Sequence, residues 1–311
     1  MFSTKAPHRH SLAPVLAVIV GIGLFATMDA LMKRASIASG VLSPLLARSA
    51  LGALVLWPIW RLREGRGSWP GPEALRLHVM RGLVAAGMTA GYFWGLVRIP
   101  LAEAIAISFI APLIALFLAA VLLGERVRPA AVGGSLVALL GVALIAAGRL
   151  RAAAAGTDAA WGIASILFSA VLYAWNLVLQ RQQAQVASPL EIAAMQNLVV
   201  ALALLSVAAM LTIAGGAAQF LLVPAWTVWP DIAASALLAS ISLMMIAWAY
   251  ARVEAQVLLP LEYTAFPWSA LVGWVWFAEP VTLPTLGGLV LILLGVWFGA
   301  RGAPQPQLPP G

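Results

Sequence analysis

Long apolar segments alternate with short polar connections along the whole chain. A helix that crosses about 30 Å of hydrocarbon needs about 20 residues, because each residue adds about 1.5 Å. By this measure the sequence predicts ten transmembrane helices, at residues 12–32, 41–60, 75–97, 101–123, 129–148, 160–180, 190–214, 231–251, 255–278 and 283–300. The connections leave no room for a soluble domain, so we expect an all-α polytopic membrane protein.

One stretch of the chain occurs twice, at a constant offset of 154 residues. The matches pair Trp94 with Trp248, Arg98 with Arg252, Glu125 with Glu279, Val127 with Val281, and Gly133, Gly134 and Gly141 with Gly287, Gly288 and Gly295. Each half then has five spans, and because five is odd, the second half enters the membrane from the opposite side. We therefore predict inverted five-helix repeats at 12–150 and 158–302, a cytoplasmic tail at 1–11 and a Pro-rich tail at 303–311.

Lysine and arginine residues in the short connections predict the orientation, because they accumulate on the cytoplasmic side. With both termini in the cytoplasm, eleven such residues lie inside and five lie outside. The five on the outer side are Lys33, Arg34, Arg98, Arg149 and Arg151. This distribution favours cytoplasmic N and C termini.

Composition supports the membrane class and narrows the chemistry. Of the 311 residues, 63% are hydrophobic and only 9% are charged, fewer charges than soluble domains carry. The absence of cysteine and of any histidine cluster leads us to expect no cofactor and no metal. The net charge of +7 comes from basic residues between apolar segments, so we expect no nucleic-acid partner. The expected partners are the lipid bilayer and a small-molecule substrate, and a ten-span chain can work as a monomer.

A family resemblance rests on the two copies of the repeated stretch. The chain has ten spans in two groups of five and an arginine before spans four and nine. The most specific matches are the segments Gly124-Glu125-Arg126-Val127 and Ala278-Glu279-Pro280-Val281. In these features the chain resembles the EamA branch of the drug/metabolite transporter superfamily, including its YddG-type exporters. The resemblance covers nearly the whole chain. It implies a multi-pass protein of the bacterial inner (plasma) membrane that moves small metabolites, commonly amino acids, without fixing the substrate.

Three ionisable residues lie inside predicted spans: Asp29, Arg48 and Glu262. An unpaired charge near the membrane centre costs ~2.5–3.5 kcal/mol, so pairing, burial or function is expected. Asp29 and Arg48 form a possible ion pair, which either contacts substrate or clamps two spans together. Glu262 has no acidic counterpart, because the offset leads to Ser108. It is the first choice for contact with substrate or a proton, and the alternative is a buried carboxylate satisfied by a neighbouring helix.

Span six carries a polar and aromatic stripe at helical spacing, composed of Trp161, Ser165, Ser169, Tyr173, Asn176 and Gln180. The stripe favours a cavity wall, although small polar residues also join membrane helices. On span three, Arg81 either faces the same interior or snorkels to the headgroups. Trp94 and Trp248 either contact substrate or anchor the membrane interface. The predicted substrate-binding residues are Glu262, Tyr263, Tyr92, Trp94, Trp161, Tyr173, Asn176, Gln180, Asp29, Arg48, Arg81 and Trp248.

Prolines interrupt the corresponding spans four and nine of the two halves. Pro112, Pro260 and Pro267 are predicted to break these helices, either as hinges beside the substrate site or as kinks for packing. By contrast, Glu125, Glu279 and the repeated glycines are interpreted as structural, because they are shared by both copies. The glycines let helices approach closely, and the glutamates can cap or pair with neighbours.

These features favour a secondary transporter that works by alternating access at a central cavity between the repeats. Few charges of both signs, together with aromatic and amide groups, suit a small zwitterion, and we expect export of amino acids, aromatic ones included. The alternatives are import of an organic cation or vitamin-like metabolite, and a passive channel. No nucleophile, metal cluster or acid pair indicates an enzyme.

Overall fold

The computed structural model describes residues 12–64, 69–111, 114, 117–118, 129–152, 157–183, 186–214, 224–250 and 259–300. In the first half these residues form α1 (Leu12–Ser39), α2 (Leu42–Glu64), α3 (Pro72–Leu96), α4 (Leu101–Ser108) and α6 (Pro129–Ala152). In the second half they form α7 (Thr157–Gln183), α8 (Pro189–Ile213), α9 (Trp229–Tyr250), α11 (Ala265–Phe277) and α12 (Leu283–Ala300), with short 3₁₀ helices η2 (Trp226–Val228) and η3 (Leu259–Thr264). The all-α class is confirmed for these parts of the chain.

Within the described residues, six helices are long and apolar enough to cross a membrane: α1, α2, α6, α7, α8 and the segment from η2 into α9. Large apolar side chains on their outer surfaces are exposed, as on α6, where Leu136 and Leu140 keep 59% and 64% of their surface. Contiguous exposed apolar surface of this kind is expected where lipid replaces water. The chain is therefore a multi-pass membrane protein.

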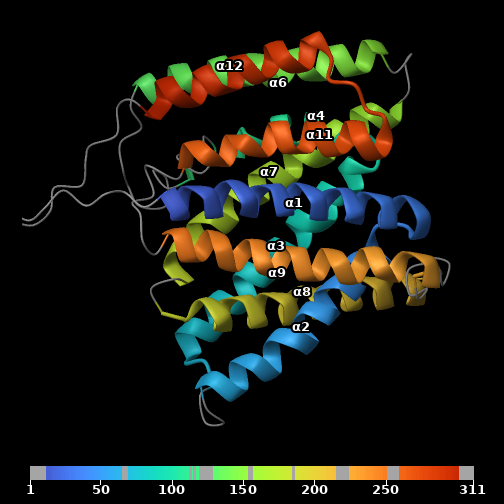
Figure 1. Cartoon of the computed structure of the whole chain (residues 1–311), viewed down its shortest axis with the longest axis vertical. Coiled ribbons are helices and arrows are strands. Elements are labelled where there is room, and N and C mark those ends of the chain that lie inside the picture. Colours follow the sequence, from blue (N-terminus) through green and yellow to red (C-terminus); the bar gives the residue numbers. More distant parts are fainter. Residues whose placement is uncertain are drawn as a thin grey trace, which may run out of the picture.

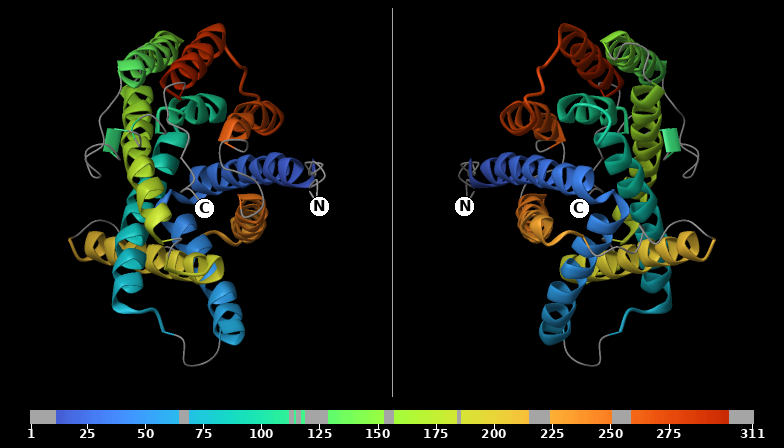
Figure 2. Two further views of the ribbon diagram at one scale, coloured as in Figure 1. Left: turned by 90° about the vertical axis from the view of Figure 1, so that its left-hand side faces the viewer. Right: turned by 90° about the vertical axis from the view of Figure 1, so that its right-hand side faces the viewer.

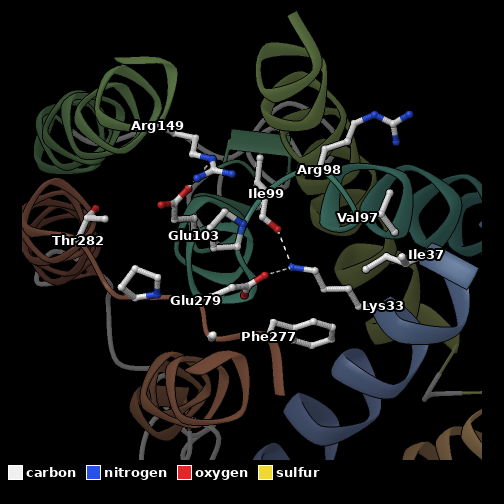
Figure 3. Close-up of a pocket in the computed structure, with 13 residues that line it drawn as sticks. Lys33, Ile37, Val97, Arg98, Ile99, Glu103, Arg149, Phe277, Glu279 and Thr282 are labelled. Carbon is white, nitrogen blue, oxygen red and sulfur yellow. Dashed lines mark hydrogen bonds and ion pairs between the residues drawn. The ribbon is translucent and has the colours of Figure 1, made fainter. Parts of the chain in front are cut away.

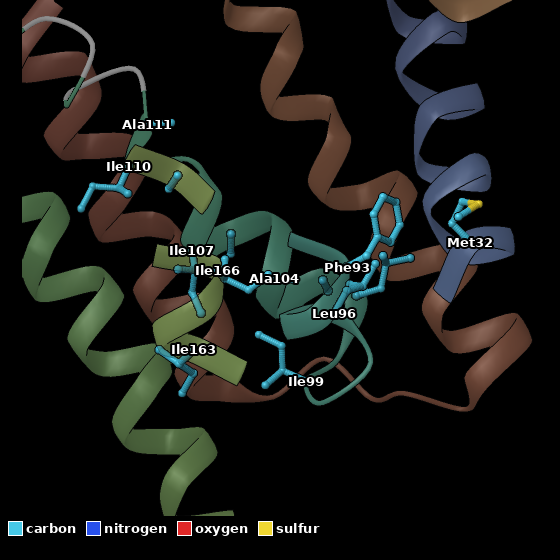
Figure 4. Close-up of a cluster of buried hydrophobic side chains, with 14 of the residues drawn as sticks. Met32, Phe93, Leu96, Ile99, Ala104, Ile107, Ile110, Ala111, Ile163 and Ile166 are labelled. Carbon is cyan, nitrogen blue, oxygen red and sulfur yellow. The ribbon is translucent and has the colours of Figure 1, made fainter. Parts of the chain in front are cut away.

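The strongest helix contacts join one half of the chain to the other. α6 packs on α12, α1 on α9, α3 on α7 and α2 on α8. Figures 1 and 2 show α6 and α12 side by side at one end of the bundle and α2 at the opposite end. Between them lies the main core, where Phe93, Leu96, Ile107 and Ile166 are buried between α3, α4 and α7 (Figure 4).

Repeated glycines explain the close contact between α6 and α12. A Cβ atom on Gly141 would lie 2.5 Å from the Gly288 carbonyl oxygen, and one on Gly288 would lie 2.5 Å from that of Gly141. A Cβ atom on Gly295 would come within 2.4 Å of the Gly134 carbonyl oxygen. Any larger side chain would force the helices apart, so the interpretation of these glycines as packing residues is confirmed.

The first helix extends beyond its predicted end. The sequence predicts a span at 12–32 with Lys33 and Arg34 in an outer connection, but α1 continues to Ser39. Residues 33–39 contain neither glycine nor proline, and the helix stops only at Gly40, whose φ of +76° is a conformation that glycine adopts readily. Lys33 is consequently buried within the bundle. Asp29 lies ten residues before the end of α1, about 15 Å along the axis, which is close to mid-depth.

Spans four and nine are interrupted close to the predicted prolines. α4 ends at Ser108, and the 3₁₀ helix η3 precedes α11 in the second half. Pro267 lies in the first turn of α11, where a missing N–H costs no intrahelical hydrogen bond. Pro260 lies within η3, and Pro112 lies outside the described residues. The interruption in span nine therefore comes before Pro267, and the hinge role of these prolines stays a prediction.

Candidate functional site

The middle of the bundle holds an acidic, a basic and a phenolic side chain from three helices. The Tyr92 hydroxyl on α3 donates a hydrogen bond to Asp29 Oδ2 on α1 over 3.1 Å. Arg48 on α2 donates from Nη1 to Met28 Sδ at 3.3 Å, and its Cζ lies 5.7 Å from the Phe93 ring centroid. All three side chains are half-buried. We call Asp29, Arg48 and Tyr92 the central cluster.

The central cluster brings together three of the predicted substrate residues, but not in the predicted pairing. Asp29 and Arg48 form no direct ion pair among the described residues. The carboxylate accepts from Tyr92 instead, while the guanidinium lies over the Phe93 ring, which attracts cations. A carboxylate and a guanidinium that are not bound to each other can bind the ammonium and the carboxylate of one zwitterion, respectively.

The polar stripe of α7 faces α3. Ser165 Oγ donates to the Gly91 carbonyl at 2.7 Å, and Ser169 Oγ donates to the Met88 carbonyl at 2.8 Å. These serines join two helices, which is the alternative to a cavity wall. Trp161 is 64% exposed. Tyr173 is partly buried against the main core, and its role in substrate binding stays a prediction.

A polar network, which we call the inner network, links α3 to α7 and α8, and four of its six members are buried. Its members are His78, Arg81, Asn176, Gln180, Gln183 and Glu191. Arg81 is 5% exposed, so it does not snorkel to the headgroups. Its guanidinium donates to Asn176 at 3.0 Å, to Gln180 at 3.2 Å and to Gln183 at 2.6 Å. The side-chain oxygens of Asn176 and Gln180 are thus used to bind Arg81. Their role in substrate binding stays a prediction.

His78 completes the inner network. It is fully buried, with Nε2 2.8 Å from Glu191 Oε1 and Nδ1 2.5 Å from Gln183 Nε2. The sequence analysis did not identify His78, Gln183 or Glu191 as site residues. Gln183 continues the α7 stripe by one further step of three residues, and that spacing could have found it.

The predicted orientation makes the other end of the bundle the outer end. There four charged residues and one threonine form an outer cluster: Lys33, Glu103, Arg149, Glu279 and Thr285. Lys33 Nζ forms an ion pair with Glu279 and donates to the Ile99 carbonyl at 2.9 Å. Glu103 lies 3.8 Å from Arg149 and accepts from Thr285 Oγ1 at 3.3 Å. The sequence analysis missed Lys33, because the predicted first span ended before it.

The outer cluster borders a pocket of about 360 Å³. Figure 3 shows Glu103 facing Arg149 on one side and Glu279 bound to Lys33 on another. The Arg98 guanidinium points away from this group. It lies 3.5 Å from the centroid of the Trp94 ring and forms an ion pair with Asp158 at 3.5 Å. The volume lies at the lower end of the range for small-molecule sites.

Glu279 is held in place by the end of α11. The preceding residue, Ala278, has a φ of +51°, and the Glu279 N–H donates back to the Gly273 carbonyl at 3.2 Å. This left-handed turn directs the Glu279 carboxylate to the start of α4, where Oε2 accepts from the Leu101 N–H at 2.8 Å. Glu279 therefore caps a neighbouring helix, as expected of a structural residue. Its counterpart Glu125 lies outside the described residues.

The two helix interruptions meet near the bundle centre. Tyr263 in η3 packs edge-on against Phe109, which directly follows α4, with ring centroids 5.0 Å apart. Trp94 and Trp248 are 37% and 41% exposed, which is compatible with anchoring at the interface. The Glu262 side chain lies outside the described part of the chain, so its predicted role stays a prediction. Within the described ranges, no group of three or more His, Cys, Asp or Glu residues could hold a metal ion.

Comparison with known proteins identifies the family. The model of the EamA-like transporter family matches residues 12–147 and again residues 160–300, which together cover most of the chain. The chain belongs to the EamA-like transporter family. Among curated proteins it is similar to the pseudopaline exporter CntI of two Pseudomonas aeruginosa strains, with 25% identity over 280 residues, covering 90% of this chain and 93% of the relative.

A solved crystal structure has the same fold. It aligns with a TM-score of 0.57 and 24% sequence identity, covering 93% of this chain and 97% of the solved chain. The likeness therefore supports the arrangement of helices along nearly the whole EamA-like chain.

Proposed function

We propose that this EamA-like transporter is a secondary exporter of a small zwitterionic metabolite, with amino acids as the expected class, and that the central cluster binds it. The observation that carries the proposal is the position of Asp29, Arg48 and Tyr92. They lie near the middle of the membrane, on three different helices, and each side chain is half-buried. Asp29 is bonded to Tyr92 and not to Arg48. A buried charge without an ionic partner is costly in a membrane, so such groups mark substrate paths.

The helix contacts support an inverted repeat. Exchanging the two halves turns the α1–α9 contact into the α7–α3 contact and maps the α2–α8 and α6–α12 contacts onto themselves. Phe109 and Tyr263, which touch, are separated by the same 154 residues as the sequence repeat. A two-fold axis between the halves would pass through this contact. Rocking of one half against the other about such an axis is the geometry of alternating access.

The distribution of charges supports a placement in the bacterial inner membrane with both termini in the cytoplasm. Three of the basic residues predicted outside, Lys33, Arg98 and Arg149, gather around one pocket. Arg61 and Arg63 lie in the last turn of α2, at the predicted inner end. A monomer with no resident cofactor, acting as a transporter and not as an enzyme, is sufficient for this proposal.

The identity of the substrate is tested by ligand stabilisation followed by transport. Purified protein is heated with each amino acid and with pseudopaline, and the best ligand is then loaded into proteoliposomes. We expect an amino acid to raise the melting temperature and to leave the vesicles faster when a gradient or counter-substrate is applied. If only pseudopaline raised the melting temperature, pseudopaline would replace amino acids as the proposed substrate. This second candidate is favoured by the two curated relatives. Transport unaffected by any gradient would indicate a channel.

A further inference from the structure

Unsatisfied polar atoms are concentrated at the outer end of the protein. Five buried side-chain atoms of the described residues lack a hydrogen-bond partner: Ser36 Oγ, Ser39 Oγ, Arg98 Nε, Glu103 Oε2 and Arg149 Nε. The serines lie in the last turn of α1, and the Arg98 guanidinium points away from the outer cluster toward Asp158. Glu103 and Arg149 line the outer pocket. Buried polar atoms are normally paired, so these two unpartnered atoms at the pocket wall point to a ligand.

Glu103 and Arg149 face each other without completing a hydrogen bond. Glu103 Oε2 lies 3.8 Å from Arg149 Nε, beyond hydrogen-bond distance, although the Glu103 side chain is only 5% exposed. The other carboxylate oxygen accepts from Thr285. The Arg149 side chain is 30% exposed and lines the pocket. One acceptor and several guanidinium donors thus remain available on the same wall.

The neighbouring charges restrict the kind of ligand. Lys33 is bound by Glu279 and the Ile99 carbonyl, while Glu279 is also bound by the Leu101 N–H. Arg98 is paired with Asp158, outside the cluster. The charges around the pocket are therefore balanced, and a purely anionic or cationic ligand would leave one uncompensated charge in a partly buried site. A ligand with one positive and one negative charge would leave the charges of the site balanced.

We propose that the outer pocket is a second, exit-side binding site for an amino-carboxylate zwitterion, in which Glu103 binds the ammonium group and Arg149 binds the carboxylate. This inference rests on the proposed export of a zwitterion. It adds a second binding site on the path from the central cluster to the outside. Phe277 and Pro280, which also line the pocket, provide an apolar surface for the remainder of the ligand. Binding replaces the incomplete Glu103–Arg149 pair by two complete charge-assisted contacts.

A unique thiol at the pocket rim gives a readout specific to this site. The chain contains no cysteine, and Ile37 lines the pocket while 58% exposed, so Ile37→Cys creates a single reactive position. In nanodiscs, the rate of maleimide labelling is measured with three probes that share a phenyl ring and differ in charge: L-phenylalanine carries both charges, phenethylamine only the ammonium and 3-phenylpropionate only the carboxylate. We expect L-phenylalanine to slow labelling and each singly charged probe to protect more weakly.

The charge-matched variants decide the assignment. In the Ile37→Cys background, Glu103→Gln should weaken protection by phenethylamine by about tenfold and leave 3-phenylpropionate unchanged, whereas Arg149→Gln should do the reverse. Glu103→Asp, which keeps the charge, should retain part of the protection. Arg98→Gln is the matched arginine control, because its guanidinium points away from the cluster (Figure 3), and it should change none of the three.

Two results would overturn the site: no protection by L-phenylalanine in the Ile37→Cys parent protein, or equal effects of both variants on all three probes, as a purely structural ion pair would give. Efflux of L-phenylalanine from proteoliposomes is measured in parallel with the native chain. Protection with the expected charge pattern but no efflux would refute the proposed exporter and keep the pocket. Efflux that depends on Tyr92 without any protection of the introduced thiol would keep the exporter and refute the exit site.

Discussion

The inner network and the outer cluster both tie the first half of the chain to the second, but they do so with different chemistry. In the inner network, one guanidinium and one imidazole are bound by three amides and a carboxylate, and none of its buried side-chain atoms lacks a hydrogen-bond partner in the described part of the chain. In the outer cluster, ion pairs dominate, and every unpartnered buried atom of the described side chains lies at that end.

This difference suggests different tasks for the two ends. A fully satisfied polar network makes a specific contact that is costly to open, because each opened bond leaves a buried polar group. An incompletely paired set of charges can exchange one partner for another at lower cost. The inner network therefore favours the packing of α3 on α7 and α8, whereas the outer cluster borders the pocket for which we propose a ligand.

The largest effect is expected from Glu279→Ala. The substitution leaves Lys33, which is 4% exposed, without its ionic partner and removes the acceptor for the Leu101 N–H. Loss of one member of a buried pair costs about 3–5 kcal/mol. Thermal unfolding in detergent should show a strong drop in melting temperature. Adding Lys33→Met should recover much of it, and an unchanged loss in the double variant would contradict a buried ion pair.

Arg81→Met should have the next largest effect, about 2–3 kcal/mol, because three amide acceptors lose a charged donor while the apolar stem is kept. The matched control is Arg76→Met on the exposed face of the same helix, which should change stability by less than about 0.5 kcal/mol. Unfolding of both variants is followed by thermal denaturation. Equal stabilities would show that the inner network does not hold the two halves together.

Tyr92→Phe tests the central cluster between the two ends. Loss of one hydrogen bond to Asp29 should cost about 1 kcal/mol in stability and raise the half-saturating substrate concentration by about three- to tenfold. Thr89→Val removes another hydroxyl of α3 that bonds only within its own helix, at Ala85 and Ala86. This control should leave the half-saturating concentration unchanged. If both variants transport alike, Tyr92 does not contact the substrate.

Arg34→Gln should have the smallest effect, although it also breaks an ion pair at the outer end. Arg34 donates from Nε to Asp231 Oδ2 at 2.7 Å, but its side chain is 54% exposed. The Asp231 side chain is only 10% exposed, but the solvent around Arg34 screens the pair, so we expect it to contribute about 1 kcal/mol and to weaken in salt. The melting temperatures of the Arg34→Gln variant and the native chain are compared at low and high salt. The difference between the two proteins should vanish at high salt. A loss as large as that of Glu279→Ala would mean that charge, and not burial, determines the cost.

Much of the fold followed from local pattern. The positions of the helices, the interruptions in spans four and nine, and the packing role of the repeated glycines depend on residue types at fixed spacing. The candidate site was only partly predictable. Asp29, Arg48 and Tyr92 were named as candidates because charged and phenolic groups are rare inside spans, and their role in substrate binding stays a prediction. Lys33 and His78 were missed, because their burial depends on helices distant in sequence.

The sequence by itself determined that this chain is a helical membrane protein built from two related halves, since hydropathy and an internal repeat are properties of the chain alone. Only the tertiary structure decided which polar residues share a site. It bound Asn176 and Gln180 to Arg81, separated Asp29 from Arg48, and joined Lys33 to Glu279 across 246 residues. Such pairings depend on how helices from opposite halves pack, and spacing along one helix carries no information about its partner.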